Sequence, residues 1–415
     1  MRRTTLSKAL LSVSALALGV ALSPLSAEAA GFYVQEVSSS SAGASNAGAA
    51  AMPRDASIIF HNPSAMTQLD GAQVNGAVHA LFTHSELEDR GSTIGGGAAS
   101  ALGFGNDGGN PGGLNTIPNL YGAMPVGYDD RLWIGLGITS PFGLGPDYDD
   151  NFFGSFLVRE AQLRVIDFTP SVSYKVNDLF SLGVSAIIQK ADLNYKFNTG
   201  LAQVTRVDAD DVATGYKLSA TITPDDDWTI GLQYRSGTNL DFDGDIGVNA
   251  AAGTASGTLN LPDIATLGVS YKVDEQWTVM GGVEWFGWNE TDVATIENSL
   301  TTDLPVSFLY ENTINVSLGA EHTYNDKWTF RAGYQYDETP TTAQARSPLN
   351  PDGNRHWFSG GATQTLDEHW SIDYAATYIN IADGNFDRTI AAGTRVAGQA
   401  QNYALIGTIG VNYKF

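Results

Sequence analysis

The sequence contains no cysteine, which excludes disulfide bridges and thiolate metal sites. It is also poor in positive charge, because 22 Lys and Arg residues stand against 45 Asp and Glu residues. The resulting net charge of −23 argues against a nucleic-acid partner or an anionic surface. No internal run of about twenty apolar residues occurs, so we do not expect a transmembrane helix. A length of 415 residues then leaves several soluble domains or one large barrel.

The first 29 residues have the pattern of a secretory signal peptide. Positive charges at Arg2, Arg3 and Lys8 precede an apolar stretch over residues 9–22, and small residues up to Ala29 offer a cleavage site. A membrane anchor would need a longer apolar stretch. We therefore expect cleavage after Ala29 and export of the mature protein.

A strand pattern recurs along the rest of the chain. The segment 325–336, NDKWTFRAGYQY, starts with turn residues and then alternates. Trp328 and Phe330 fall on one face of the strand, and Arg331 and Gln335 fall on the other. Similar segments occur at 225–236, 274–285 and 367–378, with looser versions at 129–139 and 177–186. Each follows another alternating run, which predicts a series of β-hairpins with tight turns.

The connections between these hairpins are long, in contrast to the turns within them. They are rich in Gly, Asn and Asp and cover residues 85–116, 142–160, 291–305, 338–355 and 382–400. With a first strand near 73–84 and a last near 402–415, the count reaches about fourteen strands. An even strand number, short turns, long opposite loops and tryptophans beside the turns are typical of outer-membrane barrels. A β-propeller has a similar period, but it needs four strands per repeat where only two fit. The predicted fold is therefore all-β, a transmembrane antiparallel β-barrel over residues 71–415.

Residues 30–70 are the candidate filling of this barrel, because the lumen of fourteen strands is too wide for wall side chains alone. The segment is rich in Ala and Ser, which is also compatible with a disordered tail. However, Phe32, Ile58, Ile59 and Met66 make it more apolar than solvated tails usually are. We therefore expect a compact N-terminal hatch.

Several motifs in this segment and beyond it match a known family. In the hatch they are Gly31-Phe32, Glu36, Ser38–Ser41, Gly43, Ala47-Gly48-Ala49, Asp55-Ala56 and Asn62-Pro63-Ser64. Later ones are 141–144, 170–175, 234–236, 261–262, 328–340 and 351–357. In this order they resemble the FadL family of outer-membrane long-chain fatty acid transporters. That family usually has Asn-Pro-Ala in the last hatch motif, so Ser64 is a departure.

The resemblance implies passive uptake of long-chain fatty acids or similar hydrophobic molecules. It makes Phe32, Asn62, Pro63 and Ser64 candidate hatch and gating residues. In the family, ligand leaves sideways into the membrane at an inward kink of the third strand, which is 131–142 here. Gly135 and Gly137 lie on the lumen-facing parity of this strand and are the candidate lateral opening. The alternative is that these glycines only leave space for the hatch.

The lumen-facing charges, which are Asp167, Arg235, Glu284, Glu321, Arg331 and Asp373, have two interpretations. They could form ion pairs and hydrogen bonds between wall and hatch, since buried charges need partners. Alternatively, one cation among Lys190, Arg235 and Arg331 could meet a fatty carboxylate. Lys190 is the best positional match to a basic residue of the family's pocket. By simple alternation it would face outward, however, and it can face the lumen only if a bulge lies near Ile187-Ile188. Family members also carry aromatic hydrocarbons, which need no cation, so the cargo stays open.

Other classes of function are less well supported by the residues. The six histidines lack the spacing of a metal triad, and G-x-S-x-G and Walker motifs are missing, so we expect neither an enzyme nor a cofactor. A general porin for polar solutes would have no use for a hatch, and a structural barrel or adhesin is a third possibility. The terminal Phe415 resembles the signal read by the barrel assembly machinery. We therefore expect a monomer in the outer membrane of a Gram-negative bacterium, surrounded by lipid and lipopolysaccharide.

Overall fold

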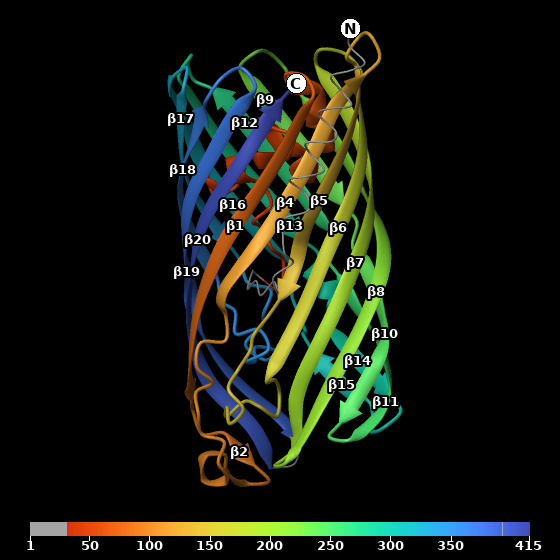
Figure 1. The fold of residues 1–415 in the computed structure, drawn as a ribbon. Coiled ribbons are helices and arrows are strands. Elements are labelled where there is room, and N and C mark those ends of the chain that lie inside the picture. The colour runs from red at the N-terminus through yellow and green to blue at the C-terminus, as the bar shows by residue number, and fades with distance from the viewer. Residues whose placement is uncertain (1–30, 392) are drawn as a thin grey trace.

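The computed structural model describes residues 31–391 and 393–415, so the predicted signal peptide lies outside the described residues. The chain forms a closed antiparallel barrel (Figure 1). Its fourteen wall strands are β1 (Gln73–Asp89), β4 (Gly113–Val126), β5 (Leu132–Leu144), β6 (Glu160–Lys175), β7 (Phe180–Gly200), β8 (Gln203–Ile222), β9 (Trp228–Arg235), β12 (Ile264–Lys272), β13 (Trp277–Phe286), β16 (Thr313–Asn325), β17 (Trp328–Asp337), β18 (Arg355–Thr365), β19 (Trp370–Ala391) and β20 (Thr394–Lys414). Each pairs with the next, and β1 pairs with β20 to close the wall. The predicted barrel is confirmed.

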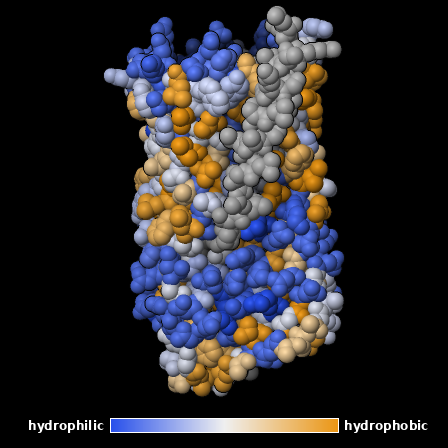
Figure 2. All heavy atoms as spheres, in the orientation of Figure 1, coloured by the Kyte–Doolittle hydropathy of each residue, from blue (hydrophilic) through white to orange (hydrophobic). Residues whose placement is uncertain are grey.

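The alternation of side chains sets which face of each strand meets lipid. On β17, Phe330 and Tyr334 are exposed on the outside, whereas Arg331 and Gln335 are buried in the lumen. Figure 2 shows apolar residues gathered over the half of the barrel that carries the tight turns, with a broad hydrophilic band beyond them. This apolar half has the character of a lipid-facing surface.

The recurring motif that precedes each tryptophan builds the tight turns. Asp225 Oδ1 accepts hydrogen bonds from the backbone N–H groups of Asp227 and Trp228. Asp274, Asn325 and Asp367 hold the turns before Trp277, Trp328 and Trp370 in the same way. A short side-chain acceptor that captures the N–H groups two and three residues later stabilises a turn locally. The motif therefore places each tryptophan at the start of a strand.

At the end of the barrel opposite the tight turns, the strands extend further than the sequence pattern indicates. The predicted loop 382–400 is wrong in that β19 and β20 continue to Ala391 and from Thr394. Here the outward face carries polar residues, such as the ion pair between Asp387 and Arg395, whereas Phe386 and Val396 are buried, so no apolar outer row marks the strands. The additional elements at this end are β2 (Thr93–Ile94), β3 (Gly97–Ala98), η3 (Ser100–Leu102), β10 (Thr238–Val248), β11 (Ala251–Leu261), η4 (Trp288–Glu290), β14 (Val293–Asn298) and β15 (Leu304–Ser307).

The N-terminal residues fill the lumen with short helical turns. These are α2 (Ser39–Ala42), η1 (Ala49–Ala51), α3 (Ile58–His61) and η2 (Pro63–Gln68). Their apolar side chains, including Val37, Ile59 and Met66, are fully buried, so burial against the wall compensates for helices too short to be stable alone. We call residues 31–70 the hatch. Among the described residues, no helix is long and apolar enough to cross a membrane.

Candidate ligand cavity and hatch contacts

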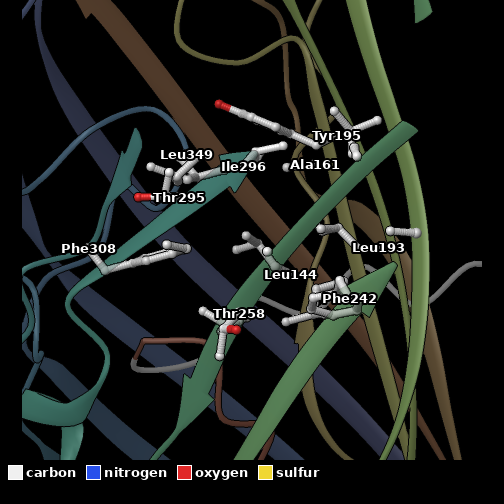
Figure 3. A pocket seen from close by; sticks show the side chains of 18 of the residues that line it. Leu144, Ala161, Leu193, Tyr195, Phe242, Thr258, Thr295, Ile296, Phe308 and Leu349 are labelled. Carbon is white, nitrogen blue, oxygen red and sulfur yellow. The ribbon is translucent and has the colours of Figure 1, made fainter. Parts of the chain in front are cut away.

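An apolar cavity of about 80 Å³ lies in the lumen, on the side of the long loops (Figure 3). Figure 3 shows side chains from several strands converging on it, among them Leu193 of the wall strand β7 and Phe242 of β10. The lining residues are Phe32, Leu144, Ala161, Leu163, Leu193, Tyr195, Val207, Ala209, Phe242, Ala255, Ser256, Gly257, Thr258, Leu259, Ala294, Thr295, Ile296, Val306, Phe308 and Leu349. A cavity of roughly 150 Å³ with a similar lining holds benzene in another protein. This cavity is smaller than that one, so it has room for part of a hydrophobic molecule and would have to widen to hold a whole one.

None of the described residues that line this cavity is charged. Two of the hydroxyl groups in the lining are already engaged, since that of Tyr195 donates to the Leu157 carbonyl and that of Thr258 donates to Asp241 at 2.7 Å. An ionised group is costly to bury without a partner. The cavity therefore suits an uncharged apolar group.

The hatch forms one end of the cavity through Phe32. Its ring lies 5.0 Å from that of Trp288 and 5.8 Å from that of Phe308, both edge to face. Such aromatic pairs contribute about 0.5–1.5 kcal/mol each beyond simple burial. The predicted gating residue Phe32 is thus held in an aromatic cluster beside the cavity.

The backbone around Phe32 adds a short strand to the edge of β5. The N–H of Val34 donates to the carbonyl of Pro141 at 2.8 Å, and the N–H of Gly143 donates to the carbonyl of Phe32 at 2.9 Å. Strand addition of this kind uses main-chain hydrogen bonds to hold a segment against an open edge.

That edge is open because the wall is interrupted between β4 and β5. Their ladder ends at Leu120 and Ile138, although both strands continue. On its other side, β5 shifts register against β6 between Thr139 and Phe142. An extra residue in one strand bends it, so the irregularity of the third strand lies at this shift.

Gly135 and Gly137 lie before this interruption, in the regular part of β5. Both face the lumen. A Cβ at Gly135 would stand 2.5 Å from Met66 Sδ and 2.7 Å from Ile59 Cδ1, and one at Gly137 would stand 3.1 Å from the Tyr121 ring. These contacts favour the alternative in which the glycines make room for the hatch and Tyr121. A role in lateral opening stays a prediction for them.

The Asn62-Pro63-Ser64 motif fastens the hatch to the wall. Asn62 Nδ2 donates to the Ala50 carbonyl at 2.7 Å and to Thr221 Oγ1 of β8 at 2.9 Å. Pro63 occupies the first position of η2, where its missing N–H costs nothing. Ser64 Oγ donates to Asn62 Oδ1 at 2.6 Å, a bond that the alanine usual at this position could not make.

The comparison with known proteins agrees with this geometry. The model of the family "Outer membrane protein transport protein (OMPP1/FadL/TodX)" matches residues 20–415. The chain belongs to this family. A long-chain fatty acid transport protein of Escherichia coli O6:H1 is 28% identical over 90% of this chain and 92% of its own length. Outer membrane protein P1 of Haemophilus influenzae is 27% identical, with coverage of 97% and 99%.

Solved structures of the OMPP1/FadL/TodX family share the fold. A FadL homologue of Pseudomonas aeruginosa superimposes with a TM-score of 0.86 at 24% identity, covering 92% of this chain and 99% of that one. The toluene transporter TodX of Pseudomonas putida gives 0.70 at 16% identity, with the same coverage. The protein is accordingly a barrel of the Gram-negative outer membrane.

The three candidate cations for a ligand carboxylate, Lys190, Arg235 and Arg331, are not among the cavity-lining residues. Lys190 lies on the outside of β7, where Nζ is 3.2 Å from Asp210 Oδ2, because β7 and β8 pair without a register shift near Ile187. Arg235 is buried against Asp167 at 2.7 Å.

Arg331 is likewise occupied. Its Nε lies 2.6 Å from Glu321 Oε2, and Nη1 lies 3.6 Å from Asp373 Oδ1. The hatch joins this group, since Ser39 Oγ donates to the other carboxylate oxygen of Asp373 at 3.2 Å. The lumen charges therefore form the wall-and-hatch lattice, which was the first of the two interpretations.

The sequence reasoning did not find the cavity, although β7 carries a signal for it. The lumen row of this strand is polar at Ser181, Ser185 and Gln189, and it becomes apolar at Tyr195 and Phe197. A change from polar to apolar on the lumen face marks the level where the barrel interior is dry.

Proposed function

We propose that the protein is a passive channel that takes hydrophobic molecules from outside the cell, holds them in the apolar cavity and releases them sideways. The observation that carries this proposal is the position of the cavity beside the wall interruption. Phe32 and Leu144 both line the cavity, and both belong to the segment where the hatch replaces β4 along β5. Since a single chain closes the barrel, a monomer is sufficient to form this channel.

Sideways release has a physical advantage for an apolar ligand. Burial of each CH₂ group is worth about 0.8 kcal/mol. A sixteen-carbon chain released into periplasmic water would therefore lose on the order of ten kcal/mol relative to the membrane. An exit through the wall between Ile138 and Leu144 avoids this loss. The hatch fills the path straight through the barrel, which disfavours the general porin.

The lining of the cavity favours an uncharged cargo or the apolar tail of a charged one. The relatives include a long-chain fatty acid transport protein, and the solved structures include a toluene transporter. In this chain, a carboxylate in the cavity would meet no cation among the lining residues. A fatty acid would therefore bind with its carboxylate outside the cavity or protonated, whereas a hydrocarbon meets no such restriction.

Binding and uptake measurements test the proposal. Purified protein should bind methyl palmitate and toluene, with palmitate weaker at neutral pH, and cells should take these compounds up only when the protein is present. Liposomes carrying the protein should not swell in sugar solutions. Rapid swelling with sugars, together with no binding of any hydrophobic probe, would establish the porin instead.

A further inference from the structure

A layer of apolar side chains crosses the barrel at the level of residues 32–34. On one side, the Tyr33 ring lies 5.0 Å from Phe286, and Phe32 lies 5.0 Å from Trp288. All four side chains are buried and belong to a large apolar cluster, which also extends into the hatch body at Ile59 and Met66.

On the other side, Val34 is the hatch residue of a separate buried cluster. Its partners come from five wall strands and are Leu81, Ile117, Trp357, Ile379, Ile381, Ala404 and Ile406. Because Phe32, Tyr33 and Val34 are consecutive, the two clusters meet at the hatch backbone. We call these three residues, together with Phe286, Trp288 and the partners of Val34, the apolar layer.

On β1 and β20, the lumen face is polar both before and after this layer. On β1, the buried lumen row reads Asn75, Ala77, His79, then Leu81, then Thr83 and Ser85. Neither amide atom of Asn75 has a hydrogen-bond partner among the described residues, and the same holds for Thr83 Oγ1 and Ser85 Oγ.

The neighbouring strand repeats this order. Ile406 of β20 stands opposite Leu81, with Thr408 and Asn412 on one side of it and Asn402 on the other. The Oδ1 atoms of Asn402 and Asn412 are also unpartnered among the described residues. On β1 and β20, the wall therefore offers hydrogen bonds to water or ions on both sides of the apolar layer.

On the side of β18, β19 and β20, the hatch itself is polar, because the serine-rich α2 packs there. The hatch carries a run of buried serines, Ser38–Ser41, and a buried ion pair of Arg54 with Glu321. Groups of this kind lower the cost of admitting water and ions, whereas an apolar constriction excludes both by dewetting.

We propose that the apolar layer is the ion seal of the channel, and that on the side of β1 and β20, where the hatch is polar, the rest of the hatch does not by itself keep ions out. The seal is a function beyond the uptake of hydrophobic molecules, because it keeps an outer-membrane barrel of this width closed to ions. Val34 and Leu81 are its central residues on the β1 side.

Substitutions that change polarity but little volume test the seal. Val34→Thr and Leu81→Asn each place a polar group in the layer, and Val34→Thr leaves the backbone bond to Pro141 intact. In planar bilayers, the wild-type protein should be nearly silent, and a deletion of residues 30–69 should give the open-channel conductance. We expect each variant to conduct several-fold more than the wild type, and the double variant to conduct most.

Two controls separate the seal from general loosening of the hatch. Leu81→Met keeps the layer apolar, and Met66→Gln places a polar group in the hatch at a fully buried position outside the layer. Both should stay as tight as the wild type. Heat-induced gel shifts verify assembly, and Val34→Thr decides the question if Leu81→Asn does not assemble. The proposal is overturned if Val34→Thr stays tight, or if Met66→Gln leaks as much as the layer variants do.

Discussion

Arg54 of the hatch and Glu321 of β16 form an ion pair in which Nε lies 2.7 Å from Oε2. The same carboxylate oxygen also accepts a hydrogen bond from Arg331 of β17 at 2.6 Å. One buried carboxylate thus neutralises two guanidinium groups that come from different parts of the chain. The pair ties the hatch to the wall, and its two members contribute unequally, because only Glu321 has two cationic partners.

We predict that Glu321→Gln destabilises the hatch more than Arg54→Met does. The first change leaves two buried guanidinium groups without their shared partner, and loss of one member of a buried pair costs about 3–5 kcal/mol. The second change leaves Glu321 paired with Arg331. Limited proteolysis of the hatch in detergent measures the difference. Equal protection of both variants would contradict the central role of Glu321.

Asn62 should matter for transport more than for barrel assembly. Asn62→Ala removes the donor to the Ala50 carbonyl and to Thr221, and each buried group left unsatisfied costs about 1–3 kcal/mol. We expect uptake of a hydrophobic substrate to fall while the amount of barrel in the outer membrane stays constant. Asn298→Ala, in the outer β14 region, is the control and should behave like the wild type. Unchanged uptake by the Asn62→Ala variant would show that Asn62 is not needed for transport.

The barrel itself could be predicted because its signals are local. The acceptor residue before each tryptophan, as at Asp225 and Asp367, builds its own turn, and alternation on β17 separates lipid-facing Phe330 from buried Arg331. Whether the side chain of Lys190 faces the lumen or the outside was harder to predict, because this depends on whether β7 contains a bulge.

The candidate site could be predicted only in part from the sequence. The hatch contacts of Asn62 could be expected from its motif, but the pairing of residues 32–34 with β5 could not, since three residues carry no periodic signal. The cavity depends on which lumen rows face one another across the barrel. Leu193 and Ile296 are about a hundred positions apart in the chain, and only closure of the barrel brings them together.

Gly135 provides a test between the two interpretations of the β5 glycines. A Cβ here would stand 2.5 Å from Met66 Sδ, and overpacking of this kind typically costs 1–3 kcal/mol. We predict that Gly135→Ala loosens the hatch and that a second change, Met66→Ala, restores its resistance to proteolysis at least in part. Rescue would identify a packing residue. Loss of uptake with a hatch as resistant as the wild type would instead support a role in lateral release.

Filling the apolar cavity should weaken ligand binding without disturbing the barrel. Ala161 of β6 is buried and lines the cavity, so Ala161→Phe places a ring in the space that the ligand needs. We expect affinity for a fluorescent hydrophobic probe to fall by about tenfold or more, which corresponds to roughly 1.4 kcal/mol. Ala186→Phe is the matched control, because Ala186 is exposed on the outside of the neighbouring β7 and its ring would meet lipid. Titration of both purified variants with the probe, after a gel shift on heating has verified folding, measures the difference. If Ala161→Phe binds the probe as tightly as Ala186→Phe does, the ligand occupies another part of the lumen.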